Sequence, residues 1–109
     1  MRKLLTALAL VSVLAGTGAA VALARTKSVG MGDNYFFNGT VKIKKGSSVH
    51  WHWSKTENLH NVTSSAKGES FRSSTGHSGS FSHTFTHRGT FTIICTKHKS
   101  TMRMKVKVT

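Results

Sequence analysis

The 109-residue chain has little of three things: cysteine occurs once, acidic residues occur three times, and proline is absent. The acids are Asp33, Glu57 and Glu69, and they do not form the carboxylate pair that acid–base catalysis needs. A thiol nucleophile beside a histidine is a weaker alternative, so we expect no enzyme. Beyond residue 24 the chain also lacks any apolar segment with helical spacing, which argues against a helical domain.

The scarcity of acids leaves a strongly basic chain, with a formal net charge of +13. Such a surface attracts acidic proteins, polyanions or anionic head groups. The lysines are spread along the sequence instead of forming one run, so we expect an acidic protein or an anionic surface as partner, and no nucleic acid. A solvated basic surface without a specific partner is the alternative.

The first 24 residues have the pattern of a secretory signal peptide. Two cations in MRKLL precede an apolar stretch, and a small-x-small cleavage site ends at Ala24. The interpretation is a signal peptide over residues 1–24 and one exported domain over 25–109, periplasmic, cell-surface or extracellular, with no membrane span after cleavage. An uncleaved anchor is the alternative, because the apolar stretch approaches the roughly 20 residues that a span needs.

Short runs of alternating apolar and polar residues fill the rest of the chain, broken by glycine, serine and asparagine. They predict an all-β domain of six to eight short strands, either a β-sandwich or a small barrel. The polar segment 64–79 is expected to be a long loop, with a short strand around Phe71 at most. The runs lie at 41–43, 49–53, 59–62, 81–85, 91–95 and 104–108.

The only cysteine, Cys95, ends one of these runs, with His98 three residues later and Met102 four residues after that. A short loop after a strand can turn three such side chains toward one point. Thiolate, imidazole and thioether together suit copper better than zinc, calcium or magnesium, although a second imidazole must then come from elsewhere. The alternative is a buried apolar residue, since Cys95 shares a strand face with Phe91 and Ile93.

The segments GDNYFFNGTVKIKKGSSVHWHW, LHNV, FTHRGTFTIICTKH and MRMKVKV extend this pattern. From about residue 29 to 109 the chain resembles the cupredoxins of the plastocyanin and pseudoazurin type, and most of all their small exported bacterial members. The resemblance implies a Greek-key β-sandwich that holds one copper ion near one end. It also implies a ligand set of His60, Cys95, His98 and Met102.

Two features depart from the pattern of these relatives. Lys97 stands where many have proline, and three residues separate His98 from Met102, where many have two or four. Met104 is therefore a rival axial ligand. We prefer Met102, because Met104 then alternates with Val106 as a core residue of the last strand.

The resemblance further implies a one-electron carrier of the type 1, or blue, copper class. Asn61, beside the first histidine, is expected to bond to Thr96, beside the cysteine. Lys97 and Lys99 flank His98, and we expect this basic rim to dock an acidic redox protein, with the protein acting as a monomer. The alternatives are an exported copper carrier or buffer and, third, a basic polyanion-binding surface protein.

The remaining histidines receive other interpretations. His50 and His52 lie two apart on an expected strand, so they share an outward face, with a weak surface metal site as the alternative. His83 is expected to be partly buried, without an assigned role, and His87 to be solvated in a turn.

Overall fold

The structure is a computed structural model that describes residues 24–109. The predicted signal peptide therefore lies outside the described residues, except for Ala24. Within residues 24–109 no helix is long and apolar enough to cross a membrane. Nine strands and one short 3₁₀ helix make up this part of the chain. They are β1 (Thr26–Gly32), β2 (Tyr35–Phe36), β3 (Thr40–Ile43), β4 (Ser48–Trp53), β5 (Thr63–Ala66), β6 (Glu69–Arg72), β7 (Gly79–Thr84), β8 (Gly89–Ile94), η1 (Thr96–His98) and β9 (Arg103–Val108).

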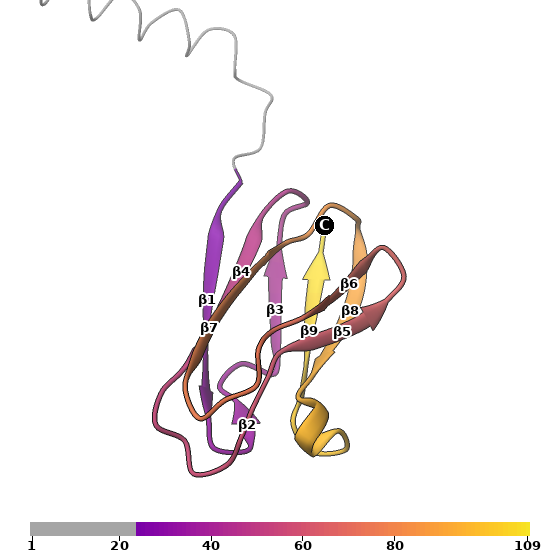
Figure 1. Cartoon of the computed structure of the whole chain (residues 1–109). Coiled ribbons are helices and arrows are strands. Elements are labelled where there is room, and N and C mark those ends of the chain that lie inside the picture. Colours follow the sequence, from indigo (N-terminus) through magenta and orange to yellow (C-terminus); the bar gives the residue numbers. More distant parts are fainter. Residues whose placement is uncertain (1–23) are drawn as a thin grey trace, which may run out of the picture.

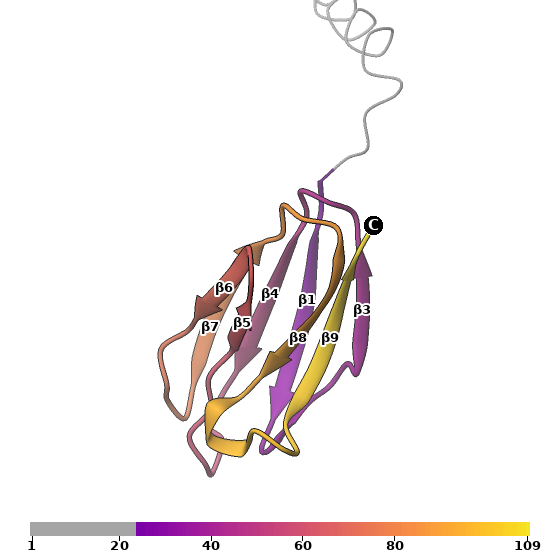
Figure 2. The ribbon, with the colours of Figure 1, turned by 90° about the vertical axis from the view of Figure 1, so that its right-hand side faces the viewer.

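The strands form two sheets that face each other, which confirms the predicted all-β sandwich (Figures 1 and 2). One sheet has the order β2-β1-β4-β7, and the other has the order β3-β9-β8-β5-β6. The pairs β1–β4 and β3–β9 are parallel, while the other pairs are antiparallel. Most consecutive strands cross between the sheets, except for the pairs β1–β2, β5–β6 and β8–β9, so residues far apart in the sequence come together at the ends of the sandwich.

Alternation along the strands builds the core between the sheets. In β4, Val49, Trp51 and Trp53 are buried, while the histidines between them face outward. In β9, Met104, Val106 and Val108 are buried between outward basic residues. The Trp51 indole N–H donates to the Met104 sulfur over 3.3 Å and so joins the two sheets. The described residues thus have two paired sheets and a hydrophobic core of their own.

The prediction of a long loop over residues 64–79 is wrong for its first half, although the short strand expected around Phe71 is present as β6. Strands β5 and β6 form an antiparallel hairpin there, with Gly68 at a φ of +86° in its turn. The hairpin lies at the edge of its sheet, where one face is wet, so it needs few apolar residues. Only Ala66 and Phe71 contribute apolar side chains against the core, which is too weak an alternation to read from sequence.

The strand expected at 59–62 is also wrong. His60 makes a single isolated bridge with Gly76, and the strand begins only at Thr63. The structure has nine strands in the described residues, one more than the predicted maximum. The strand β2 has only two residues, which are too few to show a period of two in the sequence.

The connections that follow β1, β4 and β8 meet at one end of the sandwich. Figure 1 places η1 and β2 at this lower end, and the start of β1 at the opposite end. Because η1 directly follows β8, it carries the segment from Cys95 to Met102 to this end. The predicted metal ligands therefore lie at the lower end of the sandwich.

Candidate metal centre

Three predicted ligands from two distant segments meet at the lower end of the sandwich. One donor atom each from His60, Cys95 and His98 lies within 4.8 Å of the others. The Cys95 sulfur is 3.8 Å from Nδ1 of His60. Both of these side chains are fully buried, while His98 is partly exposed. Within residues 24–109 no other group of three His, Cys, Asp or Glu side chains has this geometry.

Hydrogen bonds of the backbone close the loop that carries Cys95, His98 and Met102. The Cys95 amide donates to the Met102 carbonyl over 3.2 Å, and the Met102 amide donates to the His98 carbonyl over 2.8 Å. The loop thus folds back on itself in one short 3₁₀ turn, and the Met102 side chain is fully buried. The sulfur of Met104 instead accepts the Trp51 hydrogen bond in the core, which leaves Met102 as the methionine of the loop.

The ring of His60 is held from behind by Asp33. Its Nε2 lies 2.8 Å from Oδ1 of Asp33, and Asn58 donates to the same carboxylate from its backbone and side chain, each over 3.0 Å. The bond from His60 lowers the pKa of Asp33, helped by those from Asn58. Because a carboxylate accepts, Nε2 carries the proton and the lone pair of Nδ1 faces the Cys95 sulfur.

Sequence reasoning missed the role of Asp33. The residue lies in a Gly-Asp-Asn turn, 27 residues before His60, and no spacing rule connects the two. Its one signal was rarity, since it is one of only three acids. A carboxylate on the far nitrogen of a ligating histidine fixes the orientation of the ring and raises its basicity.

The two ligand-bearing segments are tied together by Asn61 and Thr96, with the hydrogen bond that the resemblance implies. The Asn61 side-chain amide donates to the Thr96 hydroxyl over 2.7 Å, and the Thr96 backbone N–H donates to the side-chain oxygen Oδ1 of Asn61 over 3.0 Å. Asn61 is fully buried and also bonds to Thr75. Four donors and acceptors therefore lock the loop before β5 against the end of β8.

The donor set fits copper. It combines a thiolate, two imidazoles and a buried thioether, with no carboxylate among the donors. In addition, Nε2 of His98 is buried without a hydrogen-bond partner among the described residues. A buried nitrogen without a partner lowers the stability of the fold. A metal ion bound by the cluster would remove the need for a hydrogen bond there.

The other histidines lie outside this centre. His50 and His52 stack on the outer face of their sheet, with ring centroids 6.1 Å apart, and His50 bonds to the hydroxyls of Ser80 and Ser82. His83 and His87 both bond to Glu69, which is 1% exposed, over 2.7 Å and 2.8 Å. That cluster was missed, because the three residues are separated by up to 18 positions and follow no pattern.

A comparison with family models matches residues 24–109 to the copper-binding proteins of the plastocyanin/azurin family. The chain belongs to this family. Copper is therefore the cofactor of this cupredoxin, and His60, Cys95, His98 and Met102 are positioned as a type 1 copper site. No curated protein sequence matches the chain.

Solved structures of amicyanin are similar to this cupredoxin. An oxidised proline-to-glycine variant of amicyanin is 27% identical, with 84% of this chain and 88% of that chain covered and a TM-score of 0.67. A methionine-to-alanine variant of amicyanin with Cu(I) is 26% identical, with coverage of 84% and 89% and a TM-score of 0.65. A purple cupredoxin from Nitrosopumilus maritimus, 19% identical over 76% of this chain and 99% of that chain, shares the fold with a TM-score of 0.64.

Proposed function

We propose that this cupredoxin is a one-electron carrier, with one copper ion held by His60, Cys95, His98 and Met102. The observation that carries the proposal is the buried cluster of soft donors, already assembled from two segments by hydrogen bonds. Copper bound there supplies a one-electron couple between Cu(II) and Cu(I). Asp33 and Cys95 both contact His60, but the His98 ring completes a metal-donor set around the thiol, so the proposal is a carrier and no enzyme.

The residues around the centre favour fast electron exchange because they limit movement. Asp33 fixes His60, and the Asn61–Thr96 bonds fix the start of the loop against the other ligand segment. Ligands that are held in place move little when the oxidation state of copper changes. The reorganisation energy of electron transfer is therefore small.

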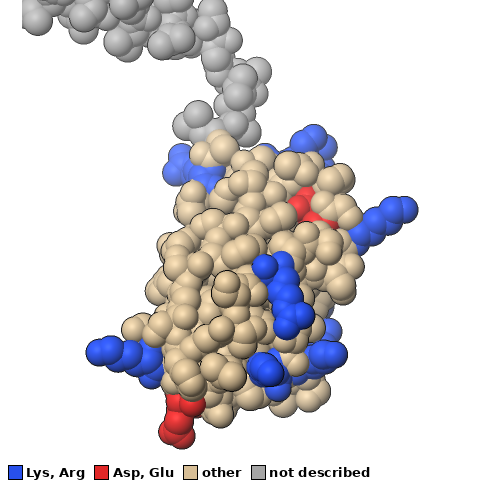
Figure 3. Space-filling view, in the orientation of Figure 1, with Lys and Arg blue, Asp and Glu red and all other residues tan. Residues whose placement is uncertain are grey.

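His98 is proposed as the point where electrons enter and leave, because it is partly exposed. A surface cavity of about 400 Å³ lies beside it, lined in part by Lys97 and Leu59, and Leu59 is 41% exposed. Figure 3 shows basic side chains gathered over η1 on the face in view. Cations with an exposed apolar side chain suit an acidic redox protein that docks over His98.

We also propose that residues 1–24 act as a signal peptide and that residues 25–109 form the exported, monomeric carrier. The support is the charge and apolar pattern of the leader, together with a domain that completes its two sheets from Thr26 onward. An exported location is consistent with the membership of this family.

The experiment that tests the proposal is a copper(II) titration of residues 25–109, followed by visible absorption. We expect an intense thiolate-to-copper band that saturates at one equivalent, bleaches with a reductant and returns with an oxidant. Cys95→Ser removes the thiolate and is expected to abolish the band. Circular dichroism of both proteins shows whether the variant is still folded.

The outcomes separate the candidate functions. A band that survives Cys95→Ser would contradict the ligand assignment. The band could also appear while the protein loses copper rapidly to a competing chelator in one oxidation state. That result would favour copper carriage over electron transfer. Retention of copper through repeated redox cycles supports the electron carrier.

A further inference from the structure

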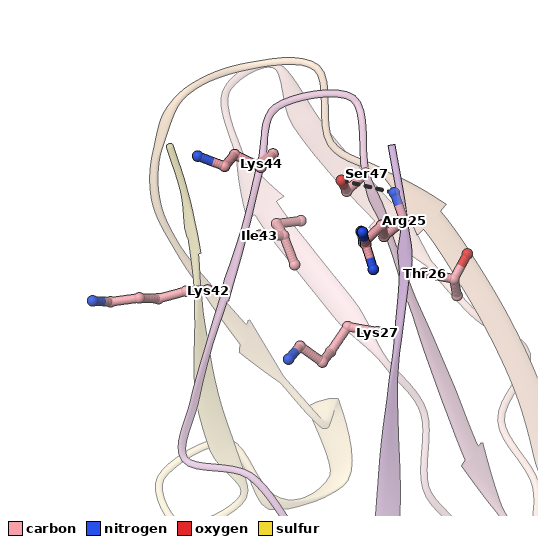
Figure 4. A pocket seen from close by; sticks show the side chains of 7 residues that line it. All are labelled: Arg25, Thr26, Lys27, Lys42, Ile43, Lys44 and Ser47. Atoms are coloured by element: carbon pink, nitrogen blue, oxygen red, sulfur yellow. Dashed lines mark hydrogen bonds between the residues drawn. The ribbon is translucent and has the colours of Figure 1, made fainter. Parts of the chain in front are cut away.

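A cleft opens between the sheets at the end of the sandwich farthest from the metal centre. Strand β3 is an edge strand paired only with β9, and β2 covers only the last two residues of β1. The first half of β1 and the end of β3 therefore each have one edge without a hydrogen-bonded neighbouring strand. The cleft there has a volume of about 530 Å³ and lies between Arg25–Lys27 and Lys42–Lys44 (Figure 4).

Cations occupy the core-facing side of β1 at this cleft. The strand alternates, so Arg25 and Lys27 share the face of Val29 and Met31, which are buried between the sheets. In Figure 4 the Lys27 side chain reaches from β1 toward β3, and Ile43 points into the space between the strands. Arg25 and Lys27 are both exposed to solvent, so the inward face of the chain changes from apolar to an open cationic surface at this end.

Further cations surround the mouth of the cleft, and no acid neutralises them. Lys42 and Lys44 line its rim and point away from β1, and Lys42 lies beside Lys107 in the sheet register. Like charges side by side on neighbouring strands cost stability. The three acids are elsewhere: Asp33 and Glu57 lie in connections at the metal end, and Glu69 is bonded to His83 and His87. An anion bound beside Arg25 and Lys27 would meet no carboxylate among the residues that line the cleft.

We propose that this cleft binds the phosphate of an acidic phospholipid head group and holds the domain at a membrane surface. The walls combine cations with the apolar side chain of Ile43 and the aliphatic stems of the lysines, which suits an amphiphile better than a fully polar polyanion. Ser47, buried at 2% exposure, adds a hydroxyl to the lining and accepts the backbone N–H of Arg25 over 3.1 Å.

The position of the cleft also favours a membrane surface. Arg25 is both a lining residue and the first residue of the proposed mature domain, so the cleft does not depend on the leader. The ligands of the metal centre lie at the opposite end of the sandwich (Figure 1). A domain held by the cleft would therefore present His98 away from the membrane. This proposal does not depend on copper or on electron transfer.

The test is co-sedimentation of residues 25–109 with lipid vesicles, which leaves the apolar leader out of the measurement. We expect binding to vesicles of phosphatidylcholine mixed with phosphatidylglycerol, and none to phosphatidylcholine alone. The double variant Arg25→Gln/Lys27→Gln should weaken binding about 25-fold, since each cation near an acidic surface contributes about fivefold. Glycerol 3-phosphate should compete with the vesicles.

The matched control is Lys55→Gln/Lys67→Gln, which removes the same charge from two exposed positions outside the cleft. It should weaken binding far less than the cleft variant, and circular dichroism should show both variants folded. Equal weakening by the two variants would overturn the proposal in favour of unspecific attraction. Binding of glycerol 3-phosphate without vesicle binding would assign the cleft to a soluble phosphate ester. No binding, with self-association of the cleft variant, would mean that the cations only protect the strand edges.

Discussion

Asp33 is the residue whose contact matters most for the chemistry of the centre. Its carboxylate accepts the Nε2 hydrogen of His60 over 2.8 Å and is itself fixed by Asn58. A negative charge placed there favours the higher charge of copper(II) over that of copper(I). Asp33 is therefore a positioning residue that also helps set the reduction potential.

Asp33→Asn is expected to weaken copper(II) binding by about 10- to 100-fold and to raise the reduction potential. A selective tenfold loss of copper(II) affinity corresponds to about 59 mV for a one-electron couple. Voltammetry and competition with a copper(II) chelator measure the two effects. Glu57→Gln is the control, because it removes an acid from the same end without a bond to His60. An unchanged potential in Asp33→Asn would contradict the role given to this carboxylate.

The two methionines of the last segment are expected to behave differently. Met102→Leu should change the visible spectrum and raise the potential, since a thioether is lost from a buried position in the ligand loop. Met104→Leu should leave the spectrum unchanged and lower the free energy of unfolding by about 1–3 kcal/mol, because the buried Trp51 N–H loses its acceptor. Absorption spectra and urea denaturation separate the effects, and the reverse result would make Met104 the axial ligand.

At the scale of elements, Glu69 fastens β6 to β7 and to the turn after it. Its carboxylate bonds to His83 and His87 and accepts the backbone N–H groups of Thr86 and His87, each over 2.9 Å. Burial alone would raise the pKa of Glu69, but these hydrogen bonds outweigh it and lower the pKa to about 2. The two strands lie in different sheets, so the cluster closes one edge of the sandwich.

The Glu69 cluster predicts a specific loss of stability in acid. The folded pKa of about 2 lies below the ordinary value of 4.5, so this stabilisation is complete above about pH 4.5 and is lost as the pH falls toward 2. Glu69→Gln should cost about 1.5–3 kcal/mol at neutral pH and should remove this part of the pH dependence. Urea denaturation of the copper-free proteins from pH 7 downward tests it, and parallel curves for the two proteins would refute it.

At the scale of the whole molecule, the charge is nearly all of one sign. The few acids are engaged or lie in one connection, so most of the surface repels cations and attracts anions. The basic rim at His98 and the basic cleft lie at opposite ends of the sandwich. One end can therefore meet a redox protein while the other meets an anionic surface.

Electron exchange with an acidic redox protein is expected to slow as salt is added, because the Debye length falls to about 10 Å at 0.1 M ionic strength. Lys97→Gln/Lys99→Gln should lower the rate several-fold at low salt and flatten its salt dependence. Stopped-flow rates measure both. Lys45→Gln/Lys67→Gln carries the same change of charge away from His98 and should have a smaller effect. An electron-exchange rate that does not change with salt concentration would contradict docking through this rim.

The sequence by itself determined the features that depend on local patterns. Alternation with a period of two marks the main strands and their buried faces, because neighbouring side chains of a strand point to opposite sides. The close spacing of Cys95, His98 and Met102 indicated a soft metal site, and resemblance indicated His60. The hairpin of β5 and β6 was not predicted, because its polar residues show little alternation of apolar and polar side chains.

Only the tertiary structure decided which distant residues meet. Three examples are the contact of Asp33 with His60, the contacts of Glu69 with two histidines, and the cleft between Arg25 and β3. The two acids contact residues 14 to 27 positions away, and the cleft lies between the two sheets. Such contacts arise from the crossing of strands between sheets and the packing of loops at their ends. No periodicity in the chain encodes them, because periodicity reports only the environment of each residue along its own strand.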